Sequence, residues 1–342
     1  MDHVILDQLR GHRRQLDFLS QAVRDQKLSS TFLFVGPSGV GRKQLALGLT
    51  QILVCESEQP ACGTCGPCRR IAIQQSESLL VIAPEKNSIT VDQSRQVLEF
   101  LSLRGLGKAR AIIIDSCHLM NPAAANTLLK IFEEPPENTY FFLLAPSPRH
   151  VLPTIRSRSQ VVRFGGLDDQ DLLEVSRKLS ATFGNSSALS SASSSASELA
   201  PNQSWLLQHA RGSLDRLKEL SSENQQETRS LAIEFLKECA SDSEFFLDPS
   251  WRDFVKAREQ AQQLARHILL LVRDLLIASK ASESAAGGDL EIQGLLEAWE
   301  GRVSSLAEAV FSLEGALAHF RDPLMVFEEF WLQQSKAVNH VG

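Results

Sequence analysis

The sequence lacks a long uncharged apolar run, an apolar leader and an excess of basic residues, and each absence narrows the class of protein. The longest apolar stretch near the C-terminus, residues 265–278, is interrupted by two arginines, a histidine and an aspartate, so we expect a buried helix there and no membrane span. The first residues are charged and amphipathic without a secretion cleavage site, so we expect a cytoplasmic protein. The formal charge of -6 provides no global attraction to nucleic acid or anionic membranes.

The first half of the chain alternates β-rich runs with amphipathic helical stretches. This alternation predicts an α/β fold, with a parallel five-stranded sheet and helices on both faces. Helices are expected over residues 42–53, 91–103 and 122–132, the last capped by Asn121 and begun by Pro122. The expected strands are residues 31–35, 79–83, 109–115, 139–145 and 160–164.

Strand signals almost vanish after residue 164. A helix is expected over 168–179, and the serine-rich tract 180–204 that follows cannot bury a core, which indicates a flexible insertion. The pattern from 227 to 338 is helical throughout, typical of an independent bundle or an oligomerisation collar. The predicted domains are residues 1–166, 167–222 and 223–342.

A glycine-rich loop, GPSGVGRK, lies between a predicted strand and a predicted helix, which is the context of a phosphate-binding loop. Its glycines would let backbone N–H groups converge on an anion at a helix N-terminus. An intact loop carries lysine and then serine or threonine where this chain has Arg42 and Lys43, and a protonated lysine offers magnesium no lone pair. The alternative is a tight strand-to-helix turn. The candidate nucleotide residues in this loop are Gly36, Gly39, Gly41, Arg42 and Lys43.

Asp115 ends a predicted strand, where a carboxylate holds magnesium through water in Walker B strands. Active ATPases of this type usually continue with a glutamate that activates the attacking water. The next residue here is Ser116, which cannot act as that base. Both defects predict that this chain hydrolyses no ATP, and they leave ATP and magnesium binding in doubt.

Four cysteines fall within CESEQPACGTCGPC, with two overlapping CxxC spacings. Four thiolates match the tetrahedral coordination that zinc prefers and leave no open position, so a structural zinc site is predicted. Two disulfides are the alternative, but thiols stay reduced in the cytoplasm. Cys117 and Cys239 stand alone and are expected to be small buried side chains. The predicted zinc ligands are Cys55, Cys62, Cys65 and Cys68.

The order of these motifs resembles the delta-prime subunits of bacterial DNA polymerase III clamp loaders, most specifically between Gly11 and Arg158. The motifs are GHRRQLDFL, GPSGVGRK, the four-cysteine insert, SITVDQSRQVLEFLSL, IIIDSCHLMNPAAANTLLKIFEEPP and LPTIRSRSQ. The resemblance implies an AAA+ domain, a helical lid and a helical collar. It also implies a hetero-pentamer with tau/gamma and delta subunits that loads the sliding clamp onto primed DNA.

The resemblance further implies two arginine roles. Arg158, in Ser157-Arg158-Ser159 where the family has Ser-Arg-Cys, would be an arginine finger that stabilises charge on ATP held by the neighbouring subunit. Without the motif it would be part of a solvated basic surface. Arg216 resembles the arginine that the lid of active relatives presents to nucleotide, and its alternative is a helix-surface arginine after the cap Ser213.

Two other functions fit parts of the sequence. The first is an active AAA+ motor subunit in which Arg42 and Lys43 work in an unusual register. The second is a zinc-containing nucleic-acid module with Arg69 and Arg70 beside a phosphate backbone, which the net charge and the scarcity of nearby aromatics disfavour. We expect a stationary clamp-loader subunit whose neighbours hydrolyse the ATP.

Overall fold

The computed structural model describes residues 4–103, 107–183, 201–240, 250–280, 290–319 and 322–338. The chain divides into two compact units. The first comprises the residues up to Gly184 with Ala210–Arg216, and the second comprises Asn185–His209 with Leu217–Gly342. The predicted three-domain division stays a prediction, and residues 184–200 of the serine-rich tract lie outside the described residues.

The first unit is built on a five-stranded sheet in which every pair of neighbouring strands is parallel, in the order β2-β3-β4-β1-β5. Each strand lies within one residue of its predicted bounds, and the predicted α/β fold class is confirmed. The strands are β1 (Thr31–Val35), β2 (Leu79–Ile82), β3 (Arg110–Ile114), β4 (Thr139–Ala145) and β5 (Gln160–Arg163).

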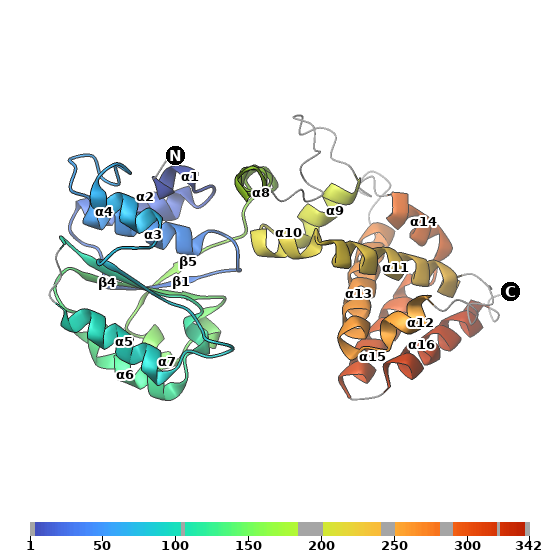
Figure 1. The fold of residues 1–342 in the computed structure, drawn as a ribbon. Coiled ribbons are helices and arrows are strands. Elements are labelled where there is room, and N and C mark those ends of the chain that lie inside the picture. Colours follow the sequence, from blue (N-terminus) through green and yellow to red (C-terminus); the bar gives the residue numbers. More distant parts are fainter. Residues whose placement is uncertain are drawn as a thin grey trace. The chain divides into compact units, whose positions relative to one another are not determined.

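Helices cover both faces of this sheet (Figure 1). One face carries α1 (Ile5–Gln8), α2 (Arg13–Arg24), α3 (Arg42–Val54) and α4 (Gly66–Ala72), and the other carries α5 (Val91–Ser102), α6 (Pro122–Glu133) and α7 (Pro153–Arg156). Phe32 and Phe34 of β1 pack in the cluster of Leu45, whereas Leu33 packs in that of Leu128. Because both of their faces are buried, the three central strands β3, β4 and β1 are largely apolar runs, whereas the edge strand β5 is mostly exposed.

The helix starts follow local chemistry. The predicted helices begin at Arg42, Val91 and Pro122 as expected. The Asn121 side chain accepts a hydrogen bond from the Ala124 N–H at 2.7 Å, which confirms the predicted cap. Thr90 and Gln93 form a reciprocal capping box at the start of α5.

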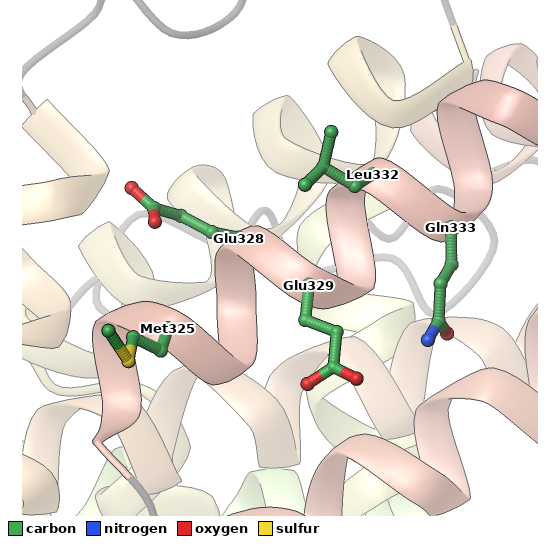
Figure 2. Close-up of a pocket in the computed structure, with 5 residues that line it drawn as sticks. All are labelled: Met325, Glu328, Glu329, Leu332 and Gln333. Carbon is green, nitrogen blue, oxygen red and sulfur yellow. The ribbon is translucent and has the colours of Figure 1, made fainter.

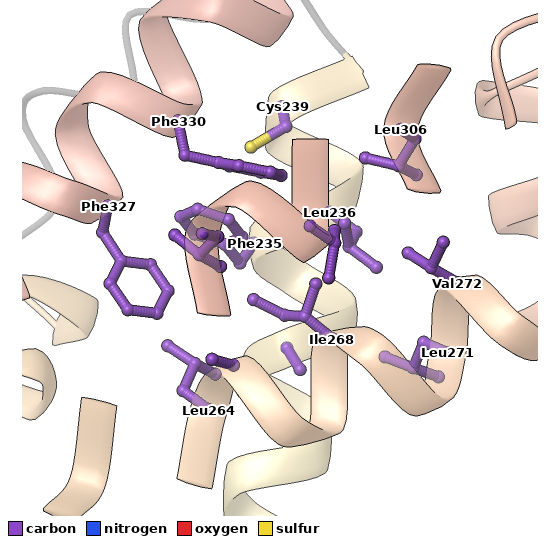
Figure 3. Packing of buried hydrophobic residues seen from close by; sticks show 14 of the residues in the cluster. Phe235, Leu236, Cys239, Leu264, Ile268, Leu271, Val272, Leu306, Phe327 and Phe330 are labelled. Atoms are coloured by element: carbon purple, nitrogen blue, oxygen red, sulfur yellow. The ribbon is translucent and has the colours of Figure 1, made fainter. Parts of the chain in front are cut away.

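The remaining helices are α8 (Asp169–Phe183) in the first unit, and α9 (Pro201–Ala210) and α10 (Leu214–Leu220), which each carry residues of both units. The second unit continues with α11 (Glu223–Ala240), α12 (Ser250–Val255), α13 (Arg258–Lys280), α14 (Leu290–Ala298), α15 (Val303–Ala318) and α16 (Pro323–Val338). Phe235 of α11, Ile268 of α13, Leu306 of α15 and Phe330 of α16 meet in its core (Figure 3). The prediction of a helical C-terminal region is confirmed.

The apolar stretch 265–278 lies within α13 and packs in this core, as predicted. Among the described residues, no helix has the length and apolar character needed to cross a bilayer. Cys239 is buried in the same core and Cys117 is buried in the first unit, which confirms both predictions.

Candidate functional site

The glycine-rich loop connects β1 to α3 at the carboxyl edge of the sheet. Gly39 has φ +65° and Gly41 has φ +93°, both in the left-handed region that favours glycine. Helix α3 begins directly after Gly41. The local backbone therefore has the strand, loop and helix order of a phosphate-binding loop, which a tight turn would share.

Three consecutive carbonyls of this loop are hydrogen-bonded to other parts of the same unit. The Ser213 hydroxyl donates to the Ser38 carbonyl at 2.8 Å, and the Leu214 N–H donates to the Gly39 carbonyl at 3.1 Å. His12 Nε2 lies 2.9 Å from the Val40 carbonyl. The loop is thus held by the segment before α2 and by the segment that opens α10.

The same segment brings a carboxylate onto the loop. A Cβ placed on Gly39 would stand 2.8 Å from Cγ and 3.0 Å from Oδ2 of Asp215. The Asp215 carboxylate therefore packs against the glycine at the centre of the loop. A negative group there opposes the approach of a phosphate by like-charge repulsion.

Arg42 points into the protein at this site. Its Nη1 donates to the carbonyl of Ala145, the last residue of β4. Burial lowers the pKa of Arg42, and the nearby Asp115 and Asp215 oppose that effect. The guanidinium is thus hydrogen-bonded to the carboxyl edge of the sheet and lies in the field of two nearby carboxylates.

The other candidate nucleotide residues lie as follows. Asp115 directly follows β3 and is half-buried, and the Ser116 hydroxyl donates to its Oδ1 at 3.4 Å. Lys43 is half-buried in the first turn of α3. Arg216 is exposed, and its backbone N–H donates to the Ser213 hydroxyl at 3.2 Å, so Ser213 caps α10. The structure brings Arg42, Asp115 and Asp215 together, and a nucleotide role for Arg216 stays a prediction.

Replacing Gly39 with alanine is expected to lower the free energy of unfolding of the first unit by about 1–3 kcal/mol. The new methyl would require a left-handed alanine and would collide with the backbone and carboxylate of Asp215. Gly165→Ala is the matched control, because a Cβ at Gly165 meets nothing within 4 Å. Thermal unfolding of both variants measures the effect, and equal stability would show that residues 213–215 do not pack on the loop.

The four predicted zinc ligands form one cluster. The Sγ atoms of Cys55, Cys62, Cys65 and Cys68 all lie within 4.8 Å of one another. A tetrahedral zinc with Zn–S bonds of about 2.3 Å separates its sulfurs by about 3.8 Å, so the most distant pair of thiols needs to close by at most about an ångström. All four cysteines are free thiols. The cluster could hold a metal ion.

Local hydrogen bonds suit this cluster to thiolate ligands. The Thr64 hydroxyl and the Cys65 N–H donate to the Cys62 sulfur, at 3.5 and 3.4 Å, and these bonds lower the pKa of Cys62 to about 6. Burial raises the pKa of Cys68. Four thiols with donors aimed at a sulfur fit zinc, which binds cysteine in its deprotonated form.

Buried contacts connect the cysteine cluster to the rest of the first unit. The Gln51 side chain of α3 accepts a hydrogen bond from the Ile5 N–H at 3.0 Å and donates to the Cys68 carbonyl at 2.9 Å. Lys108 Nζ donates to the Cys55 carbonyl at 2.8 Å. Gln51 therefore connects α3 to α1 and to α4 beside the cluster.

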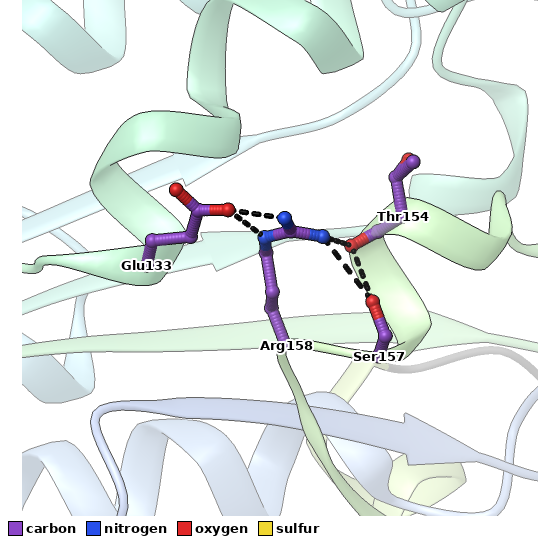
Figure 4. A network of polar contacts seen from close by, with 4 residues as sticks. All are labelled: Glu133, Thr154, Ser157 and Arg158. Atoms are coloured by element: carbon purple, nitrogen blue, oxygen red, sulfur yellow. Dashed lines mark hydrogen bonds and ion pairs between the residues drawn. The ribbon is translucent and has the colours of Figure 1, made fainter.

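Arg158 follows α7 and lies partly exposed, with 32% of its side chain accessible. Its Nε donates to Glu133 Oε1 at 2.5 Å, its Nη2 also pairs with Glu133, and its Nη1 donates to the Thr154 carbonyl at 2.9 Å and the Ser157 hydroxyl at 3.2 Å (Figure 4). All three guanidinium nitrogens thus bond to groups of the same chain at the surface. Glu133 lies in the TLLKIFEEPP segment, but the spacing of 25 residues gave no signal that it contacts Arg158.

The neighbouring arginines are arranged differently. Arg156 Nη1 donates to the Pro148 carbonyl at 3.4 Å. Near the cysteine cluster, Arg69 Nε donates to the Thr64 carbonyl at 2.7 Å, so it caps its own loop.

Sequence reasoning also missed Asp215 and Gln51, because nothing local in the sequence connects Asp215 to the glycine-rich loop or Gln51 to the cysteines.

A shallow pocket lies on α16, lined by Met325, Glu328, Glu329, Leu332 and Gln333 (Figure 2). Met325 is 66% exposed and Leu332 39% exposed. Glu328 pairs with Arg252 at 2.8 Å. The pocket brings together no set of catalytic groups, and its exposed apolar side chains are suited to contact with another protein.

The region that matches known proteins contains the motifs quoted above. The family model described as DNA polymerase III, delta subunit, matches residues 11–168. The chain is 27% identical to the DNA polymerase III subunit delta' of Bacillus subtilis over 269 residues, which cover 77% of this chain and 76% of that one. It is 37% identical to the Escherichia coli subunit delta' over 128 residues, 36% of this chain and 38% of that one.

Relatives named subunit gamma/tau also match part of the chain. The DNA polymerase III subunit gamma/tau of Mycobacterium bovis is 34% identical over 145 residues, which cover 41% of this chain and 25% of that one. The alignment with subunit delta' from Bacillus subtilis extends furthest of these, at 269 residues. The chain is therefore similar to the delta-prime subunits of bacterial DNA polymerase III, at 37% identity over 128 residues and at 27% identity over 269 residues.

Proposed function

We propose that this subunit is a stationary member of the clamp loader, which loads the sliding clamp onto primed DNA, and that it hydrolyses no ATP itself. In this role it supplies Arg158 to ATP bound by the neighbouring motor subunit. The observation that carries the proposal is the state of its own loop, which Asp215 and Leu214 cover. That loop also lacks the side chain that would hold magnesium.

The chemistry of the loop supports the absence of hydrolysis. Arg42 donates to the Ala145 carbonyl, so a phosphate that pairs with Arg42 would have to compete with this bond to the end of β4. Lys43 replaces the hydroxyl that ligates magnesium, and Ser116 replaces the glutamate that activates water. A bound nucleotide would meet the Asp215 carboxylate at Gly39.

The position of Arg158 supports the finger role. A planar guanidinium presents N–H donors in a rigid fork that matches phosphate oxygens. Arg158 lies at the surface on a short segment between α7 and β5, where a neighbouring chain can approach it. On an adjacent motor subunit it would stabilise the charge that spreads over the γ-phosphate during transfer.

The proposed partners are tau/gamma and delta subunits in a hetero-pentamer, with the sliding clamp and primer-template DNA contacted through the assembly. The second unit would serve as the collar that joins these subunits. Exposed apolar residues on its surface support this use, namely Phe311 of α15 and Met325 of α16. The cytoplasm is the proposed location, since the replication machinery works there.

The proposed cofactor is a structural zinc ion held by the four cysteines. When bound, zinc would join the four cysteine sulfurs in one tetrahedral site and so restrict the motion of the loop between α3 and α4. Gln51 and Lys108 donate to the carbonyls of Cys68 and Cys55, so fixing the cysteines would also fix these neighbouring side chains. The proposal assigns zinc no role in ATP chemistry.

The isolated chain is expected to turn over no ATP with magnesium present and to bind a fluorescent ATP analogue no better than buffer controls. Steady-state phosphate release and fluorescence anisotropy measure these quantities, with a gamma/tau subunit as the positive control. Brisk turnover by the purified chain would replace the proposal with the active-motor alternative. Salt-dependent DNA binding by the free chain would favour the zinc-containing nucleic-acid module instead.

A further inference from the structure

The Arg158 guanidinium is satisfied by its own subunit. Guanidinium carries five N–H donors. Here Nε and Nη2 face Glu133, and Nη1 faces the Thr154 carbonyl and the Ser157 hydroxyl (Figure 4). All three nitrogens are therefore engaged, and the side that would grip a phosphate in two places is taken by the Glu133 carboxylate.

Helix chemistry does not explain this placement of Glu133. It is the last residue of α6, where the helix dipole already concentrates negative charge. A carboxylate at that end is locally unfavourable unless a cation compensates it. Arg158 is the cation that pairs with it, so the contact between the two residues accounts for the acidic side chain.

The exposure of the pair sets its strength. The Glu133 side chain is 47% exposed and that of Arg158 is 32% exposed. A pair this open to solvent is weak, because water and salt screen it. A phosphate with more charge and more oxygens than a carboxylate can therefore replace Glu133 on the same donors.

We propose that the Glu133 carboxylate occupies the Nε and Nη2 donors of Arg158 in the free subunit, an arrangement that we call the sheath. The γ-phosphate of ATP on the neighbouring subunit replaces Glu133 on these donors when the finger engages. This inference rests on the proposed finger role of Arg158. Glu133 touches no substrate in this scheme. It is a positioning residue that competes with the nucleotide and sets how much ATP the assembly needs for the finger to engage.

Glu133→Gln tests the sheath in a reconstituted clamp loader in which only the motor subunit beside this chain keeps an intact phosphate loop. The amide keeps the shape of the side chain and removes its charge. We expect the ATP concentration at half-maximal turnover to fall about two- to fivefold, as for loss of an exposed ion pair, with the maximal rate unchanged. Glu134→Gln, which neutralises the adjacent exposed carboxylate, should leave both quantities unchanged.

The double variant Glu133→Gln with Arg158→Ala separates this inference from the finger role. It should turn over ATP as slowly as Arg158→Ala alone, because the sheath acts only through the finger. An unchanged or higher half-maximal ATP concentration in Glu133→Gln, with Arg158→Ala still slow, overturns the sheath and leaves the finger standing. Normal turnover by Arg158→Ala overturns the proposed function itself. Unchanged thermal unfolding of Glu133→Gln verifies that folding is not the cause.

Discussion

Replacing Arg158 with alanine is expected to lower ATP turnover about 10³-fold in a clamp loader whose only intact phosphate loop is on the adjacent motor subunit. The reason is electrostatic, since charge spreads over the γ-phosphate during transfer and the guanidinium is the group proposed to neutralise it. Steady-state phosphate release with primed DNA measures the effect. Assembly should persist, because within the described residues the polar partners of Arg158 are Glu133, Thr154 and Ser157 of its own chain.

The control for this prediction is Arg156→Ala. Arg156 lies two residues earlier at the end of α7 and donates to the Pro148 carbonyl, so its loss removes similar charge without the proposed finger. Turnover should stay within about twofold of the parent, as for an exposed charge. Equal losses in the two variants would indicate a general basic surface, the alternative reading of this region.

Zinc at a free concentration a thousandfold above its Kd is expected to raise the free energy of unfolding of the first unit by about 4 kcal/mol, and removing the zinc should abolish this gain. For a unit of this size the loss corresponds to a fall in Tm of roughly 8–16 °C. The cluster tethers α3 and α4 through Cys68 and Gln51, so its release frees the packing of both helices. Calorimetry with and without a chelator measures the change.

Metal content gives the control for this prediction. The purified chain should contain one zinc ion, and restoring zinc after chelation should restore Tm. Cys62→Ser should lose the metal and no longer respond to the chelator, because Cys62 is one of the four clustered thiols. A chain without zinc whose Tm ignores both treatments would contradict a structural metal.

The strands and helix starts of the first unit were predictable because each depends on local sequence. Continuous apolar runs mark strands buried on both faces, as in residues 31–35. Asn121 and Pro122 determine the start of α6 through a side-chain cap and a fixed φ. Close cysteine spacing likewise predicted the cluster, since a short loop with glycines can bring four sulfurs together.

The contacts that decide how the sites work were not predictable from the sequence. Ser213 bonds to Ser38 across 175 residues and brings Asp215 onto Gly39. Arg42 donates to the backbone carbonyl of Ala145, and a carbonyl is an acceptor that every residue offers. Glu133 and Arg158 come from separate helical ends that only the packed first unit brings together. The degenerate loop was visible in the sequence, but the segment that covers it was not.

The account depends most on the proposed division of labour, in which neighbouring subunits hydrolyse the ATP and this chain supplies Arg158. Adding the chain to purified tau/gamma and delta subunits with clamp and primed DNA, and measuring the rate of ATP turnover, tests that division most directly. We predict that the chain raises turnover and that the Arg158→Ala chain, although it assembles equally well, does not. Equal stimulation by both chains would contradict the account.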